Sequence, residues 1–491
     1  MERSSGILMP ISSLPSPYGI GTFGKAAYDF ADFLKAAGQK YWQLLPLGPT
    51  SYGDSPYQSF STFAGNPYFI DLDLLVKDKL LTKKEVQAHE WGTNPRYVDY
   101  GKIYEGRYPL LAKAKERGWT RDAEAVRKFE QENQGWLPDY ALFMALKRHF
   151  EMKSWLEWPE DIRAHKKEAV EKYRAELKDD VELFTYIQFL FFKQWTELKK
   201  YINDLGIRII GDLPIYVAMD SADIWAEPEM FQLDSRGFPT EVSGVPPDYF
   251  TADGQLWGNP LYNYEAMERA GFGWWIRRVG GAERLFDVIR IDHFRGFESY
   301  WSVPYGEKTA KNGKWVKGPG MKLVGALTGW FHDLEFIAED LGYATPEVAQ
   351  LLKDSKLPGM KVLVFAFNPH EPSDYLPHFY RENCVCYTGT HDNTPIGEWF
   401  EDGDPKEVEQ AKKYLGLNED EGLCFGMIRG GMGSVAKLFV AQMQDYLCLG
   451  KYNRMNTPGK ATGNWEWRML PGEADKKLAA KIADMVKLYG R

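Results

Sequence analysis

The feature that most limits the fold of this chain is a series of eight apolar, strand-like runs, each followed by residues typical of turns. Helical patterns separate many of these runs, as at 25–37, before Gly38, and at 346–352, which begins with a proline. Alternating strands and helices favour parallel units, so eight of them predict an α/β fold, a (β/α)8 TIM barrel. The predicted strands are 6–11, 41–47, 207–213, 286–292, 334–339, 361–367, 384–388 and 438–447, of which the last could also form a helix.

The predicted strands are unevenly spaced, so the barrel should carry large insertions after its second and third strands. Residues 50–200 are expected to form a helix-rich insertion subdomain, with helices at 138–150 and 181–201. Residues 217–284 are rich in aromatic residues, Pro and Gly, and we expect a loop and helical insertion over an active-site cleft. The whole of 1–491 is then one catalytic barrel unit.

Composition limits the classes of partner. The hydrophobic fraction of 44% suffices for a large core, and the net charge of −9 argues against a nucleic-acid partner. No apolar stretch reaches the ~18 residues of a membrane span, so we expect no membrane partner. The N-terminus lacks the apolar core of a signal peptide, which predicts a cytoplasmic protein.

Cysteines are few and lack the spacing of a zinc site or a disulfide framework. Cys384 and Cys386 alternate along an apolar strand, and Cys424 and Cys448 stand alone. We expect all four to be reduced residues that pack in the core.

Three carboxylates, Asp292, Glu339 and Asp392, follow three of the predicted strands. Any one of them could simply cap the next helix. In a barrel, however, the strand ends meet at one face, so the three together predict an active site there. Arg290 lies two residues before Asp292 and should point to the same side, where its charge favours the ionised carboxylate.

These residue types suit glycosyl transfer with retention, which needs an ionised nucleophile and a protonated carboxylic acid ~5 Å apart. Glu339 emerges from an apolar run, and burial there should raise its pKa. Asp392 could hold sugar hydroxyls and stabilise positive charge on the ring. His293 and His391 adjoin two of these carboxylates and are plausible donors to hydroxyl groups.

The chain also resembles a known family in ordered blocks that span nearly its whole length. The blocks are GPTSYGDSPYQ (48–58), IGDLPIYV (210–217), VPPDYF (245–250), GQLWGNP (254–260), VIRIDHFRG (288–296), AEDLG (338–342), GTHDNT (389–394), NTPG (456–459) and GNW (463–465). In this order they resemble the amylomaltases, glycoside hydrolase family 77, which are relatives of the α-amylases.

The resemblance implies roles for individual residues. Asp292 would be the nucleophile that forms a glycosyl-enzyme intermediate, Glu339 the acid/base and Asp392 the transition-state stabiliser. Arg290 would position Asp292, and His391 would bind hydroxyls beside the scissile bond. Tyr249 and Phe250 would form the tip of a mobile loop over the cleft. The other residues implied to line donor or acceptor subsites are Ser55, Tyr57, Asp212, Gln255, Trp257 and Asn464. No cofactor and no metal are implied.

The reaction that the resemblance implies moves an α-1,4-glucan segment from one maltooligosaccharide or amylose chain to the 4-OH of another, or of glucose. A hydrolase needs the same carboxylates and differs only in its acceptor, so it stays an alternative. A catalytically silent glucan-binding protein is a second alternative, although binding alone would not require Asp292 and Glu339 together. A phosphorylase is disfavoured because no Gly-rich phosphate loop is found.

Overall fold

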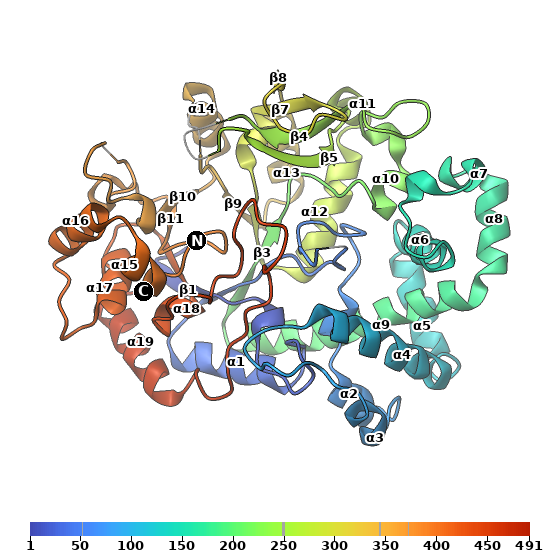
Figure 1. The fold of residues 1–491 in the computed structure, drawn as a ribbon, viewed down its shortest axis with the longest axis horizontal. Helices are drawn as coiled ribbons and strands as arrows, with labels where there is room; N and C mark the ends of the chain where they lie inside the picture. Colours follow the sequence, from blue (N-terminus) through green and yellow to red (C-terminus); the bar gives the residue numbers. More distant parts are fainter. Residues whose placement is uncertain (52, 248–250, 343–344, 372) are drawn as a thin grey trace.

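The computed structural model describes residues 1–51, 53–247, 251–342, 345–371 and 373–491 (Figure 1). At its centre is an eight-stranded sheet of parallel strands in the order β10-β11-β12-β1-β2-β3-β6-β9. The backbone N–H of Ala338 donates to the carbonyl of Pro358 at 2.9 Å and joins the two outer strands, so the predicted barrel is confirmed. The strands are β1 (Ser4–Leu8), β2 (Tyr41–Gln43), β3 (Arg208–Leu213), β6 (Val288–Ile291), β9 (Glu335–Ala338), β10 (Gly359–Val362), β11 (Cys384–Tyr387) and β12 (Leu438–Gln442).

Several predicted strands end earlier than expected, among them 6–11, which ends at Leu8, and 41–47, which ends at Gln43. The run 361–367 leaves the sheet after Val362 and forms a 3-10 turn at Leu363–Phe365. The run 438–447 is β12 followed by the short helix α18 (Met443–Tyr446). Its first half is therefore the predicted strand, and its second half is the alternative helix. Asp445 caps the N-terminus of α18, because its carboxylate accepts from the backbone N–H of the N-cap residue Gln442 at 3.3 Å.

A ring of helices covers the outside of the barrel, and α19, α1, α9, α12, α13 and α14 each contact the next (Figure 1). In α1 the buried residues Ala27, Phe30, Ala31 and Leu34 recur at three- and four-residue spacing, which turns one apolar face to the sheet. The helices that connect or cover the barrel strands are α1 (Lys25–Ala36), α9 (Lys178–Asp204), α12 (Gly273–Leu285), α13 (Met321–Trp330), α14 (Pro346–Ser355), α15 (Ile396–Asp402), α16 (Pro405–Leu415), α17 (Leu423–Met432) and α19 (Lys476–Leu488). Among the described residues, none of the helices is both long and apolar enough to cross a bilayer.

The segment between β2 and β3 is helical, as the sequence indicates, and α9 joins it to the barrel. Gln188 of α9 binds the backbone N–H and C=O of Gly65, at 2.7 and 2.9 Å. One turn and a half further on, Gln194 binds both backbone groups of Asp71 in the same way. The side-chain amides of Gln188 and Gln194 thus hold the segment that follows β2 against α9. The other helices here are α2 (Leu72–Lys77), α3 (Lys83–Gln87), α4 (Tyr100–Gly118), α5 (Ala123–Glu132), α6 (Leu137–His149), α7 (Glu160–Arg163) and α8 (Lys167–Glu176).

A second sheet, antiparallel and four-stranded, lies above one side of the barrel in the order β5-β4-β7-β8 (Figure 1). Our expectation of only loop and helix in 217–284 missed its first two strands, which pair with each other, and of which β4 also pairs with β7, beyond β6. Its strands are β4 (Glu241–Val245), β5 (Gln255–Pro260), β7 (Ser299–Pro304) and β8 (Lys314–Lys317), and the helices of the same insertion are α10 (Ala222–Ala226) and α11 (Tyr264–Arg269).

One expectation about the cysteines is wrong. Cys424 on α17 and Cys448 after α18 form a disulfide, with their Cα atoms 5.8 Å apart. The fold brings together two residues that are 24 positions apart, within the range that a disulfide spans. Cys384 and Cys386 are free and buried in β11, as expected.

Candidate active site

The guanidinium of Arg290 is the electrostatic centre of the site. Its Nη1 donates to Oδ1 of Asp292 at 2.9 Å and to both carboxylate oxygens of Asp212, at 2.6 and 2.7 Å. Arg290 lies in β6 and Asp212 in β3, and these strands are neighbours in the barrel. The prediction that Arg290 and Asp292 face the same side is confirmed. The side chain of Asp292 is 29% exposed, whereas those of Arg290 and Asp212 are buried.

Glu339 follows β9, the strand next to β6, and its carboxyl group is held by backbone N–H groups. The N–H of His293 donates to Oε2 at 2.7 Å and that of Leu341 donates to Oε1 at 2.8 Å. Only 8% of Glu339 is exposed. Burial raises the pKa of Glu339 to about 8, and the nearby charge of Asp292 adds to the effect.

The pKa of Glu339 lies above that of Asp292. Burial raises the pKa of Asp292 to about 6, although the Arg290 guanidinium acts in the opposite direction. The sequence indicated the effect of Arg290 but not the burial that outweighs it. At neutral pH Asp292 is therefore mostly ionised and Glu339 mostly protonated. A base or nucleophile and an acid thus stand at the ends of adjacent strands.

Asp392 lies in the loop after β11 and is the most exposed of the three carboxylates, at 44% of its side chain. The side-chain amide of Asn456 donates to Oδ1 of Asp392 at 2.6 Å. The guanidinium of Arg454 donates to the backbone carbonyl of Asp392 at 3.0 Å. The sequence patterns predicted no role for Arg454 or Asn456, although Asn456 begins the NTPG block.

Tyr57 connects His391 to Asp212, which binds Arg290. Its hydroxyl donates to Oδ2 of Asp212 at 2.7 Å, and Nε2 of His391 lies 2.9 Å from the same oxygen. Because the hydroxyl proton goes to Asp212, His391 Nε2 is the donor in this second bond. Ser55 Oγ in turn accepts from the backbone N–H of Tyr57 at 3.2 Å.

A cavity of about 570 Å³ opens above these residues. Its wall contains Asp292, Asp392 and His391 of the predicted site, and Ser55, Tyr57, Gln255 and Trp257 of the predicted subsites. Arg290, Asp212, Glu339 and His293 lie outside this lining. Unpredicted lining residues include Gln58, Tyr216, Asn259, Asn456 and Trp465. Tyr249 and Phe250 lie outside the described residues.

His293 is buried, and its role as a donor to sugar hydroxyls stays a prediction. Its backbone is in the left-handed region, with φ of 54°. The ring meets that of Trp257 edge-on, with 4.8 Å between centroids. Burial, and next the charge of Arg295, lower the pKa of His293 to about 3, so the ring is neutral.

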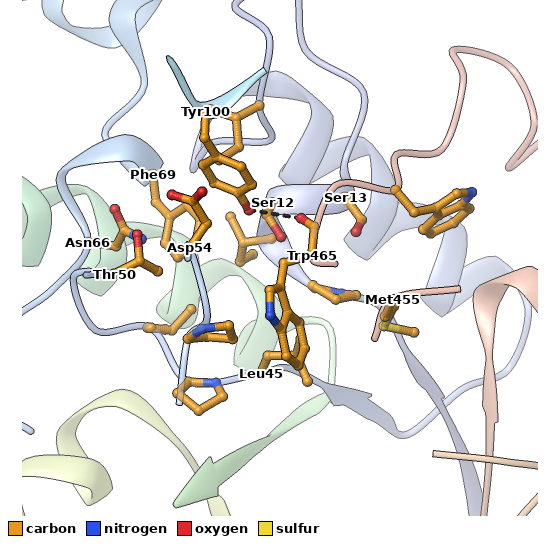
Figure 2. Close-up of a pocket in the computed structure, with 17 residues that line it drawn as sticks. Ser12, Ser13, Leu45, Thr50, Asp54, Asn66, Phe69, Tyr100, Met455 and Trp465 are labelled. Carbon is orange, nitrogen blue, oxygen red and sulfur yellow. Dashed lines mark hydrogen bonds between the residues drawn. The ribbon is translucent and has the colours of Figure 1, made fainter. Parts of the chain in front are cut away.

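Trp465 lines the cavity, whereas the neighbouring Asn464, a predicted subsite residue, lies outside the lining. The amide of Asn464 accepts from the N–H of Thr457 and donates to the carbonyl of Lys460, so it binds its own loop. Trp465 separates the cleft from a small cavity of about 30 Å³ (Figure 2). Figure 2 shows the hydroxyl of Tyr100, from α4, donating to the carbonyl of Trp465 at 2.8 Å. The helical insertion thereby supports the wall.

The arrangement combines a (β/α)8 barrel, carboxyl groups at the ends of its adjacent strands, and a cleft with tyrosine and tryptophan in its wall. These features define a barrel enzyme of carbohydrate chemistry.

Comparison with known proteins identifies the family. The profile of the family described as 4-alpha-glucanotransferase, glycoside hydrolase family 77, matches residues 9–473. A 4-alpha-glucanotransferase of Clostridium butyricum is 50% identical over 98% of this chain and 100% of its own. One from Thermus thermophilus is 46% identical over 100% and 99%. The chain therefore belongs to glycoside hydrolase family 77 and is an enzyme of the 4-alpha-glucanotransferase type.

Solved structures agree with this assignment. The amylomaltase of Streptococcus agalactiae, solved in complex with acarbose, superimposes with a TM-score of 0.97, with 41% identity and 100% of both chains covered. The amylomaltase of Corynebacterium glutamicum shares the fold, with a TM-score of 0.79 and 20% identity over 98% of this chain and 75% of its own.

Proposed function

We propose that this enzyme transfers α-1,4-glucan segments from one maltooligosaccharide or amylose chain to the 4-OH of another chain or of glucose. The reaction is a double displacement with retention, through a covalent glycosyl-Asp292 intermediate. The observation that carries the proposal is the pair of carboxyl groups at adjacent strand ends, with Asp292 bound by the Arg290 guanidinium and buried Glu339 held by two backbone N–H groups. Acarbose, the ligand named for the Streptococcus agalactiae structure, is a suitable probe of the same cleft.

In the first step, ionised Asp292 attacks the anomeric carbon, and the bond from that carbon to the glycosidic oxygen breaks. Protonated Glu339 gives its proton to the departing oxygen. Asp392 holds ring hydroxyls and stabilises the positive charge that develops on the sugar. In the second step, Glu339 takes the proton of the acceptor 4-OH, and this oxygen displaces Asp292. The configuration at the anomeric carbon is inverted twice and so retained.

Transfer requires that a sugar hydroxyl compete with water, whose concentration is ~55 M. An acceptor held in the cleft gains effective molarity over free water. Tyr57, Trp257 and Trp465 provide aromatic surface in the wall, on which the C–H faces of glucose rings can stack. These residues support transfer over hydrolysis.

The decisive experiment incubates the purified enzyme with maltotriose and ¹³C-labelled glucose and separates the products by size. Transfer gives maltopentaose and longer chains, with label at their reducing ends. Glucose and maltose alone would identify a hydrolase, and unchanged maltotriose and amylose would favour a glucan-binding protein. NMR of early products should show α-anomers, whereas β-anomers would exclude the double displacement. A cytoplasmic location stays a prediction, which cell fractionation tests.

A further inference from the structure

The loop that carries His391 and Asp392 runs from Thr388, after β11, to Ile396, at the start of α15. Within this loop, Oδ1 of Asn393 accepts from the backbone N–H and the hydroxyl of Thr390, at 2.8 and 2.9 Å. These bonds shape the turn but do not attach it to the barrel. Asn456 and Arg454 bind Asp392 itself, and the position of the whole loop depends further on what holds its two ends.

Both ends are held by one buried carboxylate, that of Asp445. The hydroxyl of Thr388 donates to its Oδ2 at 2.5 Å, and the backbone N–H of Ile396 donates to its Oδ1 at 2.8 Å. Asp445 belongs to α18, directly after β12, and β12 pairs with β11. A rigid element of the neighbouring strand thus brackets the loop on both sides.

The surroundings of Asp445 are unusual for a residue with only a packing role. The side chain is fully buried, and its partners among the described residues are the two loop donors and the N–H of Gln442. A buried carboxylate is costly unless donors surround it, and an apolar side chain would fill the same space without that cost. What the carboxylate provides is two directed bonds, one to each end of the loop.

We propose that Asp445 is a positioning residue for glucan transfer, which holds His391 and Asp392 against the sugar by fixing both ends of their loop. The proposal rests on the proposed function, because Asp392 must act on the reacting sugar for its position to matter. Asp445 itself lies outside the cleft lining.

Two substitutions weaken the attachment of the loop to residue 445. In Asp445→Asn, one carboxylate oxygen becomes an NH₂ group, which cannot accept from a backbone N–H, so either Ile396 or Gln442 loses its acceptor. Thr388→Val removes only the hydroxyl and keeps the shape of the side chain. Asp71 and Thr22 offer a matched control pair. Thr22 Oγ1 donates to Oδ2 of buried Asp71 at 2.7 Å, and the N–H of Leu74 donates to its Oδ1 at 2.8 Å.

The test is a double-mutant cycle between residue 445 and Asp392, with Asp392→Asn as the second change. The substrate is α-maltosyl fluoride with a maltose acceptor, since fluoride leaves readily and slow variants stay measurable. In the wild-type background, Asp445→Asn should lower kcat about 10- to 100-fold and change KM less than about threefold, the effect of a misplaced transition-state group. In the Asp392→Asn background, it should lower kcat by no more than about threefold.

Thr388→Val should show the same non-additivity, and it replaces Asp445→Asn if that variant does not fold. Asp71→Asn and Thr22→Val should keep kcat within about twofold of the wild type. A folded Asp445→Asn enzyme with wild-type kcat would overturn the proposal, as would an equal proportional loss in both backgrounds. If the wild-type enzyme forms no transfer product at all, the proposed function fails first, and this outcome is distinct from an additive cycle in an active transferase.

Discussion

The backbone N–H of His293 donates to Oε2 of Glu339 at 2.7 Å, so the residue that follows Asp292 directly holds the other carboxyl group of the pair. The left-handed conformation of His293, with φ of 54°, sets the direction of this N–H. The relative position of Asp292 and Glu339 is therefore fixed through the main chain.

This relationship predicts that the backbone of residue 293 matters more than its ring. His293→Asn should keep kcat within about tenfold of the wild type, because Asn tolerates the left-handed region. His293→Val should lower both kcat and the thermal midpoint clearly more, because a β-branched residue is strained there. Steady-state kinetics and thermal melts of the two variants check this, and equal losses in both would assign the effect to the ring.

The pKa values of Asp292 and Glu339 predict a bell-shaped pH profile. The value of kcat/KM should rise with pH through about 6, as Asp292 ionises, and fall above about 8, as Glu339 loses its proton. In Glu339→Gln, assayed with α-maltosyl fluoride, the alkaline limb should vanish because fluoride needs no acid to leave. An alkaline limb that persists in this variant would assign it to another group.

Removal of the Asp292 carboxylate should stop turnover but not binding. Asp292→Asn should lower kcat at least about 10⁴-fold, because no intermediate can form. Acarbose binding, measured by calorimetry, should stay within about tenfold of the wild type. Mass spectrometry must exclude deamidation, and Asp71→Asn serves as an active control. Turnover near the wild-type rate would remove Asp292 from the mechanism.

Asn456 should matter for catalysis through its bond to Asp392 Oδ1. Asn456→Ala should lower kcat about 10- to 100-fold, because Asp392 loses the donor that orients it. Asn456→Asp should be worse, since two carboxylates would then repel each other. Asn418→Ala is a control, because that amide accepts from the backbone N–H of Glu421 on an exposed loop. Wild-type kcat in Asn456→Asp would contradict this role.

The Cys424–Cys448 disulfide should contribute to stability. Closing a loop of 24 residues stabilises a fold by about 3 kcal/mol in the chain-entropy treatment. Dithiothreitol should therefore lower the thermal midpoint of the wild-type protein by a few degrees. The Cys424→Ser/Cys448→Ser protein should melt at the lower temperature with or without reductant. A reductant effect that persists in that double variant would point to another cause.

Sequence patterns predicted the parts of the site that follow directly from the barrel. Asp292, Glu339 and Asp392 stand where apolar strands end, and parallel strands bring such ends to one face. Arg290 and Asp292 share a side because residues two apart in a strand do so. The bond from Arg290 to Asp212 could not be foreseen in the same way, since it depends on the register of β3 against β6.

Several other features of the fold and the site join segments that are far apart in the sequence, so no local pattern predicts them. Arg454 and Asn456 reach Asp392 from a loop 62 and 64 residues further along the chain. Asn464 binds its own loop because of how that loop folds. The strands β4 and β5 contain Gly and Pro, which are typical of loops, and they become strands by pairing with each other and with β7. The disulfide likewise requires α17 and the loop after α18 to meet.

The pairing of β1 with β12 has a consequence for how the enzyme is made. In each register pair, from Ser4 with Leu438 to Leu8 with Gln442, the partner of β1 is synthesised long after β1 itself. Translation at ~5–20 residues per second leaves that edge of β1 unsatisfied for about 20 seconds or more. Asp445 and Asn456 emerge later still. A nascent chain therefore exposes an open sheet edge and has no working transferase site, so protection by chaperones during synthesis should matter more for this barrel than for folds with local contacts.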